Sequence, residues 1–236
     1  MVYIVGVGPG SGLYLSRMGE DIIKRTQLII GGQRNIDFIR SSIGIYSHQD
    51  LYRIGSNLGE MINKININID KDIVVLASGD PSIYGIADYI RRNMVDKKVL
   101  NSIKGQAQYE KGQVGQVVGH SNLEIVPGIS SIQYAFSIFQ IPMNDLYISS
   151  SHGRLPDYDF IFTHDKVVML TDSNIGPREI AKEVEARKEN YTFYVGENLS
   201  YPNQRLTVGL ASDILSIERY DMCVVILVRW REKNEK

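Results

Sequence analysis

Cysteine and long apolar segments are nearly absent from this sequence of 236 residues. Its single cysteine, Cys223, excludes a disulfide framework, and the apolar residues around it predict a buried thiol. No segment has the length of apolar sequence that a bilayer requires, and no signal-type stretch opens the chain. We therefore expect a cytoplasmic protein that does not contact a membrane.

An excess of charge of either sign is also missing. Lysine and arginine total 26 against 27 aspartates and glutamates, so the net charge of −1 gives no electrostatic reason to expect nucleic acid as a partner. The four histidines share no H-x-x-x-H or H-E-x-x-H spacing, and one cysteine cannot build a zinc site, so no metal site is predicted. Charged residues make up 22% and apolar residues 43%, a balance that is typical of globular proteins.

Three common catalytic motifs are missing as well. A dinucleotide-binding G-x-G-x-x-G that starts at Gly6 would need glycine in place of Ser11, and an acidic residue in place of Gly31-Gly32. No Gly-Lys-Ser/Thr follows the glycine-rich segment, so a phosphate-binding P-loop is excluded. No G-x-S-x-G is present to mark a nucleophilic serine. A Rossmann oxidoreductase is therefore not supported.

Apolar runs and helical spacings alternate along the chain, which predicts α/β architecture. Strands are predicted at 2–7, 28–30, 44–46, 72–77, 123–126, 146–149, 166–170, 191–195 and 222–228. Helices are predicted at 15–26, 35–39, 58–69, 83–94, 132–139 and 177–188. Residues 95–121 are polar, rich in glycine and without periodicity, which indicates an insertion or linker. We expect an N-terminal domain at 1–121, a C-terminal domain at 122–231 and a charged tail at 232–236.

The segment Ser78-Gly-Asp-Pro81 separates a buried strand from a helix predicted to start at Ile83. Ligands of α/β proteins gather at the carboxyl ends of strands, where turns present backbone groups to a crevice. Gly79 permits close approach, Asp80 adds a carboxylate and Pro81 stiffens the corner. The alternative is a structural corner in which Asp80 caps the helix. Similar turns follow other predicted strands, so we expect a ligand held mostly through main-chain groups.

Four such segments carry a resemblance to a known family. They are Val5-Gly-Val-Gly-Pro-Gly10, Ser78-Gly-Asp-Pro81, Pro127-Gly-Ile-Ser-Ser131 and Glu197-Asn198-Leu199. In order and spacing the chain resembles the tetrapyrrole methylases, the class III S-adenosylmethionine methyltransferases, from Tyr3 to about Val228. Gly31-Gly-Gln-Arg34 and Ser151-His-Gly-Arg154 are similar to the precorrin-6Y/cobalt-precorrin-7 C5-methyltransferase branch. The resemblance implies two α/β domains, each a mixed sheet flanked by helices.

The same resemblance implies that S-adenosylmethionine binds in an adenosyl pocket between the domains. The matching positions for this cosubstrate are Pro9, Gly79, Asp80, Ile83, Ser130, Ser131, Leu170 and Leu199. Gly8 and Gly10 would face the tetrapyrrole. We add Arg34, His152 and Arg154 as candidates for the carboxylates of a corrin precursor, because arginine can bind a carboxylate through two parallel hydrogen bonds. The alternative for these three residues is a solvated surface charge or an ordinary turn histidine.

The implied reaction transfers a methyl group to C5 of a precorrin-7-type intermediate of cobalamin biosynthesis, and S-adenosylhomocysteine is the other product. The acceptor is an enamine-like carbon, so the reaction does not require a strong catalytic base, and the catalytic residues stay unknown. The resemblance also suggests a homodimer and a separate enzyme for C15 methylation and decarboxylation. The alternatives are a family member that methylates another corrin position, a protein or an RNA, and a tetrapyrrole-binding protein without catalysis. The substrate could contain cobalt or be metal-free.

Overall fold

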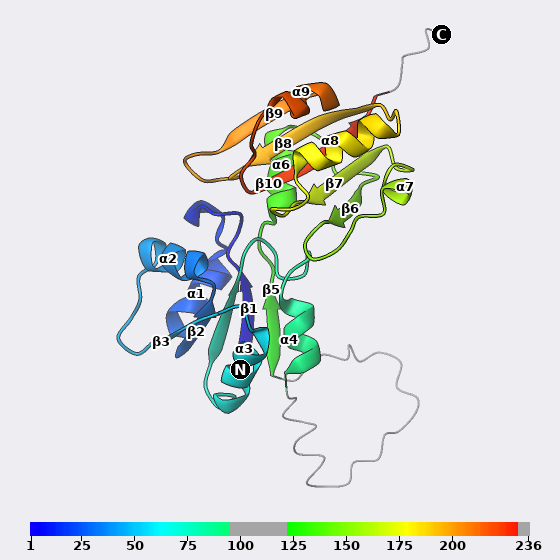
Figure 1. The fold of residues 1–236 in the computed structure, drawn as a ribbon. Helices are drawn as coiled ribbons and strands as arrows, with labels where there is room; N and C mark the ends of the chain where they lie inside the picture. The colour runs from blue at the N-terminus through cyan, green and yellow to red at the C-terminus, as the bar shows by residue number, and fades with distance from the viewer. Residues whose placement is uncertain (95–121, 231–236) are drawn as a thin grey trace. The chain divides into compact units, whose positions relative to one another are not determined.

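A computed structural model describes residues 1–94 and 122–230 of the chain. The chain divides into two compact units, Met1–Ser130 and Ser131–Lys236, and each has its own five-stranded sheet (Figure 1). The expected insertion at 95–121 and tail at 232–236 lie outside the described residues. The predicted α/β fold with two domains is confirmed.

The sheet of the first unit is parallel throughout, in the order β3-β2-β4-β1-β5. Its strands are β1 (Val2–Gly6), β2 (Leu28–Gly31), β3 (Asp50–Arg53), β4 (Ile73–Ala77) and β5 (Leu123–Val126). Every residue of the inner strands β1, β2 and β4 is buried. Continuous apolar runs form these strands because helices cover both faces of a parallel sheet.

Helices of the first unit pack on the two faces of this sheet. They are α1 (Arg17–Arg25), α2 (Gln33–Ser42), α3 (Leu58–Ile67) and α4 (Ala87–Asn93), with the 3-10 helix η1 (Gly12–Tyr14) after β1. One apolar cluster joins α1 and α2 to the sheet, and another joins α3 and α4 to it. Polar side chains fix two of the starts: Ser16 accepts from Gly19 N at 3.0 Å, and Asn57 accepts from Gly59 N at 2.9 Å.

Three predictions for the first unit are wrong. The third strand lies at Asp50–Arg53 and not at 44–46, where Gly44 has a φ of 90° that no strand accommodates. Helix α4 starts at Ala87 and not at Ile83, because the φ of 48° at Tyr84 interrupts the helical conformation. Residues 122–130 belong to the first unit, because β5 pairs in parallel with β1.

The second unit has a mixed sheet in the order β6-β7-β10-β8-β9. Its strands are β6 (Tyr147–Ser150), β7 (Lys166–Leu170), β8 (Tyr191–Glu197), β9 (Arg205–Gly209) and β10 (Cys223–Arg229). Only β6 and β7 pair in parallel, and the other pairs are antiparallel. Its helices are α6 (Ser131–Ile138), α7 (Tyr158–Ile161), α8 (Pro177–Ala186) and α9 (Ala211–Ser216).

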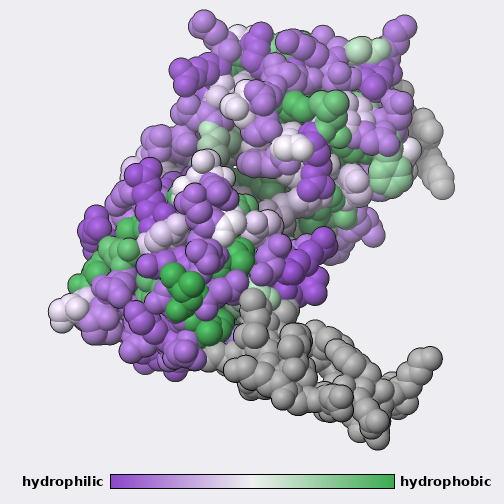
Figure 2. All heavy atoms as spheres, turned by 60° about the horizontal axis from the view of Figure 1, so that its bottom comes forward, coloured by the Kyte–Doolittle hydropathy of each residue, from purple (hydrophilic) through white to green (hydrophobic). Residues whose placement is uncertain are grey.

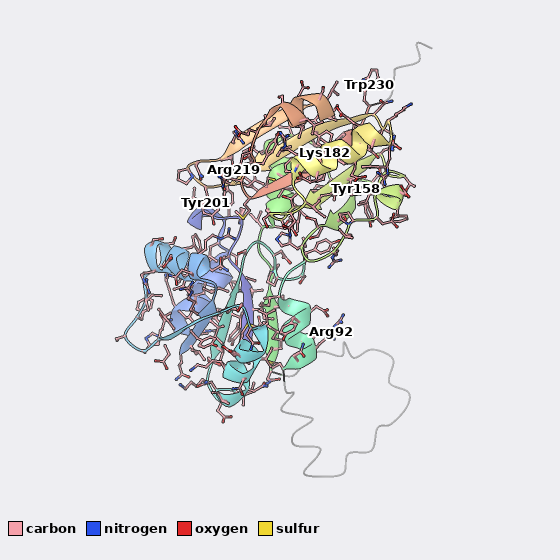
Figure 3. The ribbon with its side chains drawn as sticks, viewed as in Figure 1. Arg92, Tyr158, Lys182, Tyr201, Arg219 and Trp230 are labelled. Carbon is pink, nitrogen blue, oxygen red and sulfur yellow. The ribbon has the colours of Figure 1, made fainter. Side chains whose placement is uncertain are left out.

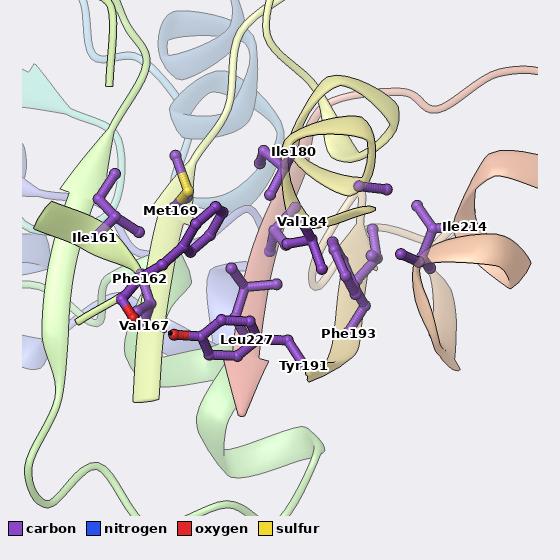
Figure 4. Packing of buried hydrophobic residues seen from close by; sticks show 14 of the residues in the cluster. Ile161, Phe162, Val167, Met169, Ile180, Val184, Tyr191, Phe193, Ile214 and Leu227 are labelled. Carbon is purple, nitrogen blue, oxygen red and sulfur yellow. Dashed lines mark hydrogen bonds between the residues drawn. The ribbon is translucent and has the colours of Figure 1, made fainter. Parts of the chain in front are cut away.

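A large apolar cluster forms much of the core of the second unit. Figure 4 shows Phe193 of β8 between Val184 of α8 and Ile214 of α9, and Tyr191 of β8 toward Phe162, all of which are buried. Alternate residues of β8 point into this cluster, as expected for a strand with one face on the core. Helix α8 begins with Pro177, and the Glu179 carboxylate accepts from Gly176 N at 3.1 Å to satisfy the helix start.

The surface carries no extended apolar face in the view of Figure 2. Hydrophilic residues predominate there, and the hydrophobic ones form small separate groups. Among the helices at 1–94 and 122–230, none is long and apolar enough to cross a bilayer.

Candidate functional site

The turns after β1 and β4 meet at the carboxyl edge of the first sheet. Gly79 N donates to Gly8 O at 2.8 Å, and Gly8 N donates to Gly79 O at 3.3 Å. The φ angles of Gly8 and Gly79 are 83° and 64°, which side-chain-bearing residues adopt only with strain. Glycine at both positions therefore lets the two turns pair directly beyond the strand ends.

The turn after β5 joins this contact, and no side chain fits between the three backbones. A Cβ atom on Gly128 would lie 2.3 Å from Gly79 O and 2.8 Å from the carbonyl carbon of Gly6. A Cβ atom on Gly6 would lie 2.6 Å from both Gly79 O and Gly128 N. Because the obstructing atoms belong to the backbone, rotation of a side chain cannot relieve the clash. Main-chain atoms therefore form the centre of this edge.

Asp80 fastens the turn after β4 to the turn after β5. Its Oδ1 accepts from Ser82 N at 2.7 Å, and its Oδ2 accepts from Gly128 N at 3.1 Å. Asp80 does not cap α4, which begins only at Ala87. Two backbone donors hold the two carboxylate oxygens, and this arrangement suits a residue that positions a loop.

Arg34 reaches the same edge from the first turn of α2. Its Nη2 donates to Ser78 Oγ at 3.1 Å, and Ser78 Oγ donates to Asn35 Oδ1 at 3.0 Å. Asn35 Nδ2 in turn donates to Leu76 O at 3.3 Å, at the end of β4. The predicted substrate residue Arg34 and the Asp80 turn are thus linked through Ser78.

The glycine-rich loop after β1 places Pro9 and Gly10 at this edge, and both are half-buried. Ser11 Oγ accepts from Leu13 N at 3.4 Å and so starts η1. The side chain of Leu13 is 90% exposed, which adds apolar surface to the loop. Ile83, after the β4 turn, is half-buried.

Ser130 and Ser131 follow β5 at the junction of the two units. Ser130 is buried, and Ser131 is the first residue of α6. They occupy the strand-to-helix turn that the sequence predicts, with Ser130 in the first unit and Ser131 in the second.

In the second unit, a cavity of about 560 Å³ lies beside the segments that follow β6 and β7. Its lining includes His152, Thr171, Asp172, Arg178 and Tyr220. Backbone N–H groups of Ile175 and Asn174 donate to Asp172 Oδ1 at 2.8 and 2.9 Å, and these hydrogen bonds lower the pKa of the carboxyl group. Burial raises the pKa of the Tyr220 hydroxyl to about 12. The cavity lining therefore combines the ionised carboxylate of Asp172 with the neutral hydroxyl of Tyr220 and the basic side chain of Arg178.

The remaining predicted residues lie at or near strand ends of the second unit. His152 and Arg154 are both exposed in the turn after β6, and Leu170 is the last residue of β7. Leu199, after β8, is 4% exposed. It packs so closely on β8 that a Cβ atom on Gly196 would lie 2.6 Å from Leu199 Cδ2.

Several residues that shape these edges are not among the predicted site residues. They are Gly6 and Gly128, which lie inside quoted motifs, and Asn35 and Asp172. Each lies at or just after a strand end or at the start of the following helix, so position alone gave a signal. Their partners are far away in sequence, however, and only the folded chain identifies them. Among the described residues, no group of three or more His, Cys, Asp or Glu side chains could hold a metal ion.

The family model of Tetrapyrrole (Corrin/Porphyrin) Methylases matches residues 1–100 and 107–215. The chain belongs to the tetrapyrrole methylase family. It is 32% identical to cobalt-precorrin-7 C(5)-methyltransferase of Salmonella typhimurium over 210 residues, which are 87% of this chain and 89% of that protein. It is 27% identical to a probable cobalt-precorrin-7 C(5)-methyltransferase of Methanocaldococcus jannaschii, with 91% of each chain covered.

Solved structures of this family share the fold. A precorrin-6Y methylase from Archaeoglobus fulgidus matches with a TM-score of 0.64 at 22% identity, covering 98% of this chain and 99% of that one. Uroporphyrin-III C-methyltransferase from Thermus thermophilus, solved in complex with S-adenosylhomocysteine, matches with a TM-score of 0.68 at 18% identity and 96% coverage of both chains. The tetrapyrrole methylase thus has the two-domain fold expected from its sequence.

Proposed function

We propose that this tetrapyrrole methylase transfers a methyl group from S-adenosylmethionine to C5 of cobalt-precorrin-7 in cobalamin biosynthesis. The observation that carries the proposal is the 32% identity to a cobalt-precorrin-7 C(5)-methyltransferase across 87% of the chain. The match of the family model to residues 1–100 and 107–215 and the main-chain character of the first sheet edge agree with it.

The residues present fit a methyl donor that is held mainly by backbone groups. The turns after β1, β4 and β5 bring glycine backbones together where larger residues would block the approach. From the first unit we assign Pro9, Gly79, Asp80, Ile83 and Ser130 to the donor. From the second unit we assign Ser131, Leu170 and Leu199. Asp80 has a positioning role in this assignment, because both its oxygens accept backbone hydrogen bonds.

S-adenosylmethionine supplies a methyl group that its sulfonium has already activated, and the acceptor is an enamine-like ring carbon. The protein then has to align donor and acceptor, with reacting atoms about 3–3.5 Å apart, and to exclude water. A rigid backbone edge fastened by Asp80 serves that purpose without a proton acceptor. We assign no catalytic base for this reason.

The acetate and propionate groups of a corrin precursor require positive partners. Arg34 stands at the first sheet edge, hydrogen-bonded to Ser78, and His152 and Arg154 are exposed after β6. We assign these three cations to substrate carboxylates and Gly8 and Gly10 to the tetrapyrrole face. Arginine is suited to this task because its guanidinium group can bind a carboxylate through two parallel hydrogen bonds.

The decisive experiment uses S-adenosylmethionine with a ¹³C-labelled methyl group. Incubation with cobalt-precorrin-7 should add one methyl group by mass spectrometry, and ¹³C NMR should place the label on C5. Label on another carbon would favour methylation of a different corrin position. Two relatives named as cobalt-factor III methyltransferases, at 23% and 24% identity, represent that alternative. Binding of a corrin with no transfer on any precursor would favour a non-catalytic tetrapyrrole-binding protein.

Two further expectations concern partners. A precorrin-6Y C(5,15)-methyltransferase of Sinorhizobium, named as decarboxylating, is 23% identical, and the match covers 76% of this chain but 37% of that protein. We propose that a separate enzyme carries out the C15 methylation and decarboxylation, because the Salmonella relative, 89% of which is covered, is named for C5 methylation alone. We also propose a cytoplasmic homodimer, which light scattering coupled to gel filtration would test by its mass.

A further inference from the structure

We propose that Glu197 and Arg205 form a positioning pair that holds Leu199 in the shape required for the methyl donor. The inference rests on the proposed function, because it assumes that Leu199 contacts S-adenosylmethionine. It assigns a role to two side chains that are not among the proposed donor or substrate residues: Glu197, which lies in the Glu197-Asn198-Leu199 motif, and Arg205.

The pair lies where β8 ends and β9 begins, with the two residues directly opposite in register. The Glu197 side chain is 2% exposed and that of Arg205 is 50% exposed. Arg205 Nε donates to Glu197 Oε2, and Arg205 Nη2 donates to Oε1 at 2.8 Å. The backbone N–H of Asp221 donates to the same Oε1 at 2.9 Å. A buried carboxylate thus has three donors from two segments.

Further contacts extend this pair to the loop before β10. Arg205 Nη2 also donates to Arg219 O at 3.0 Å, and the guanidinium carbon lies 5.6 Å from the centre of the Tyr220 ring. Figure 3 labels Arg219 in that loop and Tyr201 in the β8–β9 connection. The pair therefore links the start of β9 to the segment that leads into β10.

The turn that carries Leu199 is tied to the same loop. Asn198 Nδ2 donates to Asp221 Oδ2 at 3.2 Å, and Asn198 N donates to Met222 O at 2.9 Å. The φ angles of Asn198 and Ser200 are 46° and 67°, so Leu199 lies between two residues in the left-handed region. Such conformations persist only where surrounding contacts impose them. The Glu197–Arg205 pair fixes the loop that supplies those contacts.

Stability alone is a poor explanation for this pair. Removing the Glu197 carboxylate from water is costly, and an ion pair with a buried member can often be replaced by apolar residues of similar volume without loss of stability. If the pair were only structural, such a replacement would preserve the behaviour of the protein. If the pair positions the turn, the replacement would preserve folding but weaken binding of the donor.

The test is the double variant Glu197→Leu/Arg205→Met in the full chain. Calorimetry should show a dissociation constant for S-adenosylhomocysteine that is roughly 10-fold higher than in the wild-type protein. The melting temperature should change little. In steady-state assays KM for S-adenosylmethionine should rise while kcat stays near the wild-type value, because the loss affects ground and transition states alike. Arg205→Lys keeps the positive charge but cannot donate two parallel hydrogen bonds to Glu197. Its dissociation constant for S-adenosylhomocysteine should lie between those of the wild-type protein and the double variant.

A matched control exists in the same unit. Glu189 and Arg229 form an ion pair near the opposite end of β8, where the Arg229 guanidinium carbon lies 4.5 Å from the centre of the Tyr191 ring. Glu189→Leu/Arg229→Met should leave the dissociation constant for S-adenosylhomocysteine unchanged, even where it lowers the melting temperature. If the Glu197 double variant unfolds, Glu197→Gln, which keeps the side-chain size, takes its place, and its dissociation constant for S-adenosylhomocysteine is compared with that of the wild-type protein.

Two outcomes separate this inference from the proposed function. Equal affinity for S-adenosylhomocysteine in the wild-type protein and the folded Glu197 double variant would overturn the inference and leave the proposed function standing. A similar loss of affinity in both double variants would also overturn it, because the effect would not be specific to the Leu199 turn. A wild-type protein that binds neither S-adenosylmethionine nor S-adenosylhomocysteine would overturn the proposed function together with the inference.

Discussion

Replacement of Gly128 by alanine should destabilise the first unit and weaken binding of the methyl donor. The added Cβ atom would lie 2.3 Å from Gly79 O and 2.8 Å from the carbonyl carbon of Gly6. Both neighbours are backbone atoms, so the turn after β5 must move away from the end of β1 and the turn after β4. Overpacking of this kind costs about 1–3 kcal/mol. For a chain of this size each kcal/mol corresponds to about 2–4 °C, so the melting temperature should fall by roughly 2–12 °C.

Scanning calorimetry and titration with S-adenosylhomocysteine measure the two effects on the same sample. Gly55→Ala is the matched control, because Gly55 is exposed and a Cβ atom there would meet nothing within 4 Å. This control should be neutral or slightly stabilising, by up to about 1 kcal/mol, since alanine restricts the unfolded chain. If Gly128→Ala melts and binds like Gly55→Ala, the backbone contact of the three turns does not exist as described.

Three other perturbations follow from the same contacts. Asp80→Ala removes the acceptor for Ser82 N and Gly128 N, so calorimetry should show S-adenosylhomocysteine binding weakened about 10–100-fold. The effect on the free energy of unfolding should be smaller. A larger effect on unfolding than on binding would indicate a purely structural residue. Arg34→Ala should raise KM for the corrin substrate by up to about 5-fold and leave donor affinity unchanged, and an effect on the donor instead would contradict the assignment. Burial raises the pKa of Cys223 from 9.0 to about 12, so the thiol stays protonated in the folded protein where the unfolded chain ionises. The contribution of the protonated thiol to the free energy of unfolding is complete below pH 9 and is lost as the pH rises toward 12. In denaturant titrations over that range, the free energy of unfolding of the wild-type protein should therefore fall relative to that of Cys223→Ala, by up to about 1.4 kcal/mol per pH unit.

The buried strands could be predicted because their signal is local. Runs such as Ile73–Ala77 and Cys223–Arg229 contain little but apolar residues, which is the pattern of strands covered on both faces or placed centrally in a sheet. Their alternation with helical spacings was enough to identify the α/β fold. The motif order along the chain was then enough to identify the family.

The features that the sequence did not reveal depend on contacts between distant residues. Strand β3 is Asp50–Arg53, a short and largely exposed edge strand whose composition is polar, so the apolar run near Gly44 was preferred. Tyr84 adopts a left-handed conformation that nothing in its residue type indicates. The bond between Asp80 and Gly128 spans the segment that was expected to end the first domain. The carboxylate in the turn made Asp80 a predicted site residue, but only its hydrogen bonds to Ser82 N and Gly128 N show that it joins two turns.

The position of β1 has a consequence for synthesis of the protein. Although β1 is the first strand of the chain, it lies inside its sheet, and Val2 pairs with Ile73 on one side and Leu123 on the other. A growing chain must therefore carry an apolar strand without its β4 neighbour for roughly 4–14 s and without its β5 neighbour for roughly 6–24 s at common elongation rates. Any product that terminates before Leu123 would expose one side of β1 as an apolar edge, open to pairing with other chains.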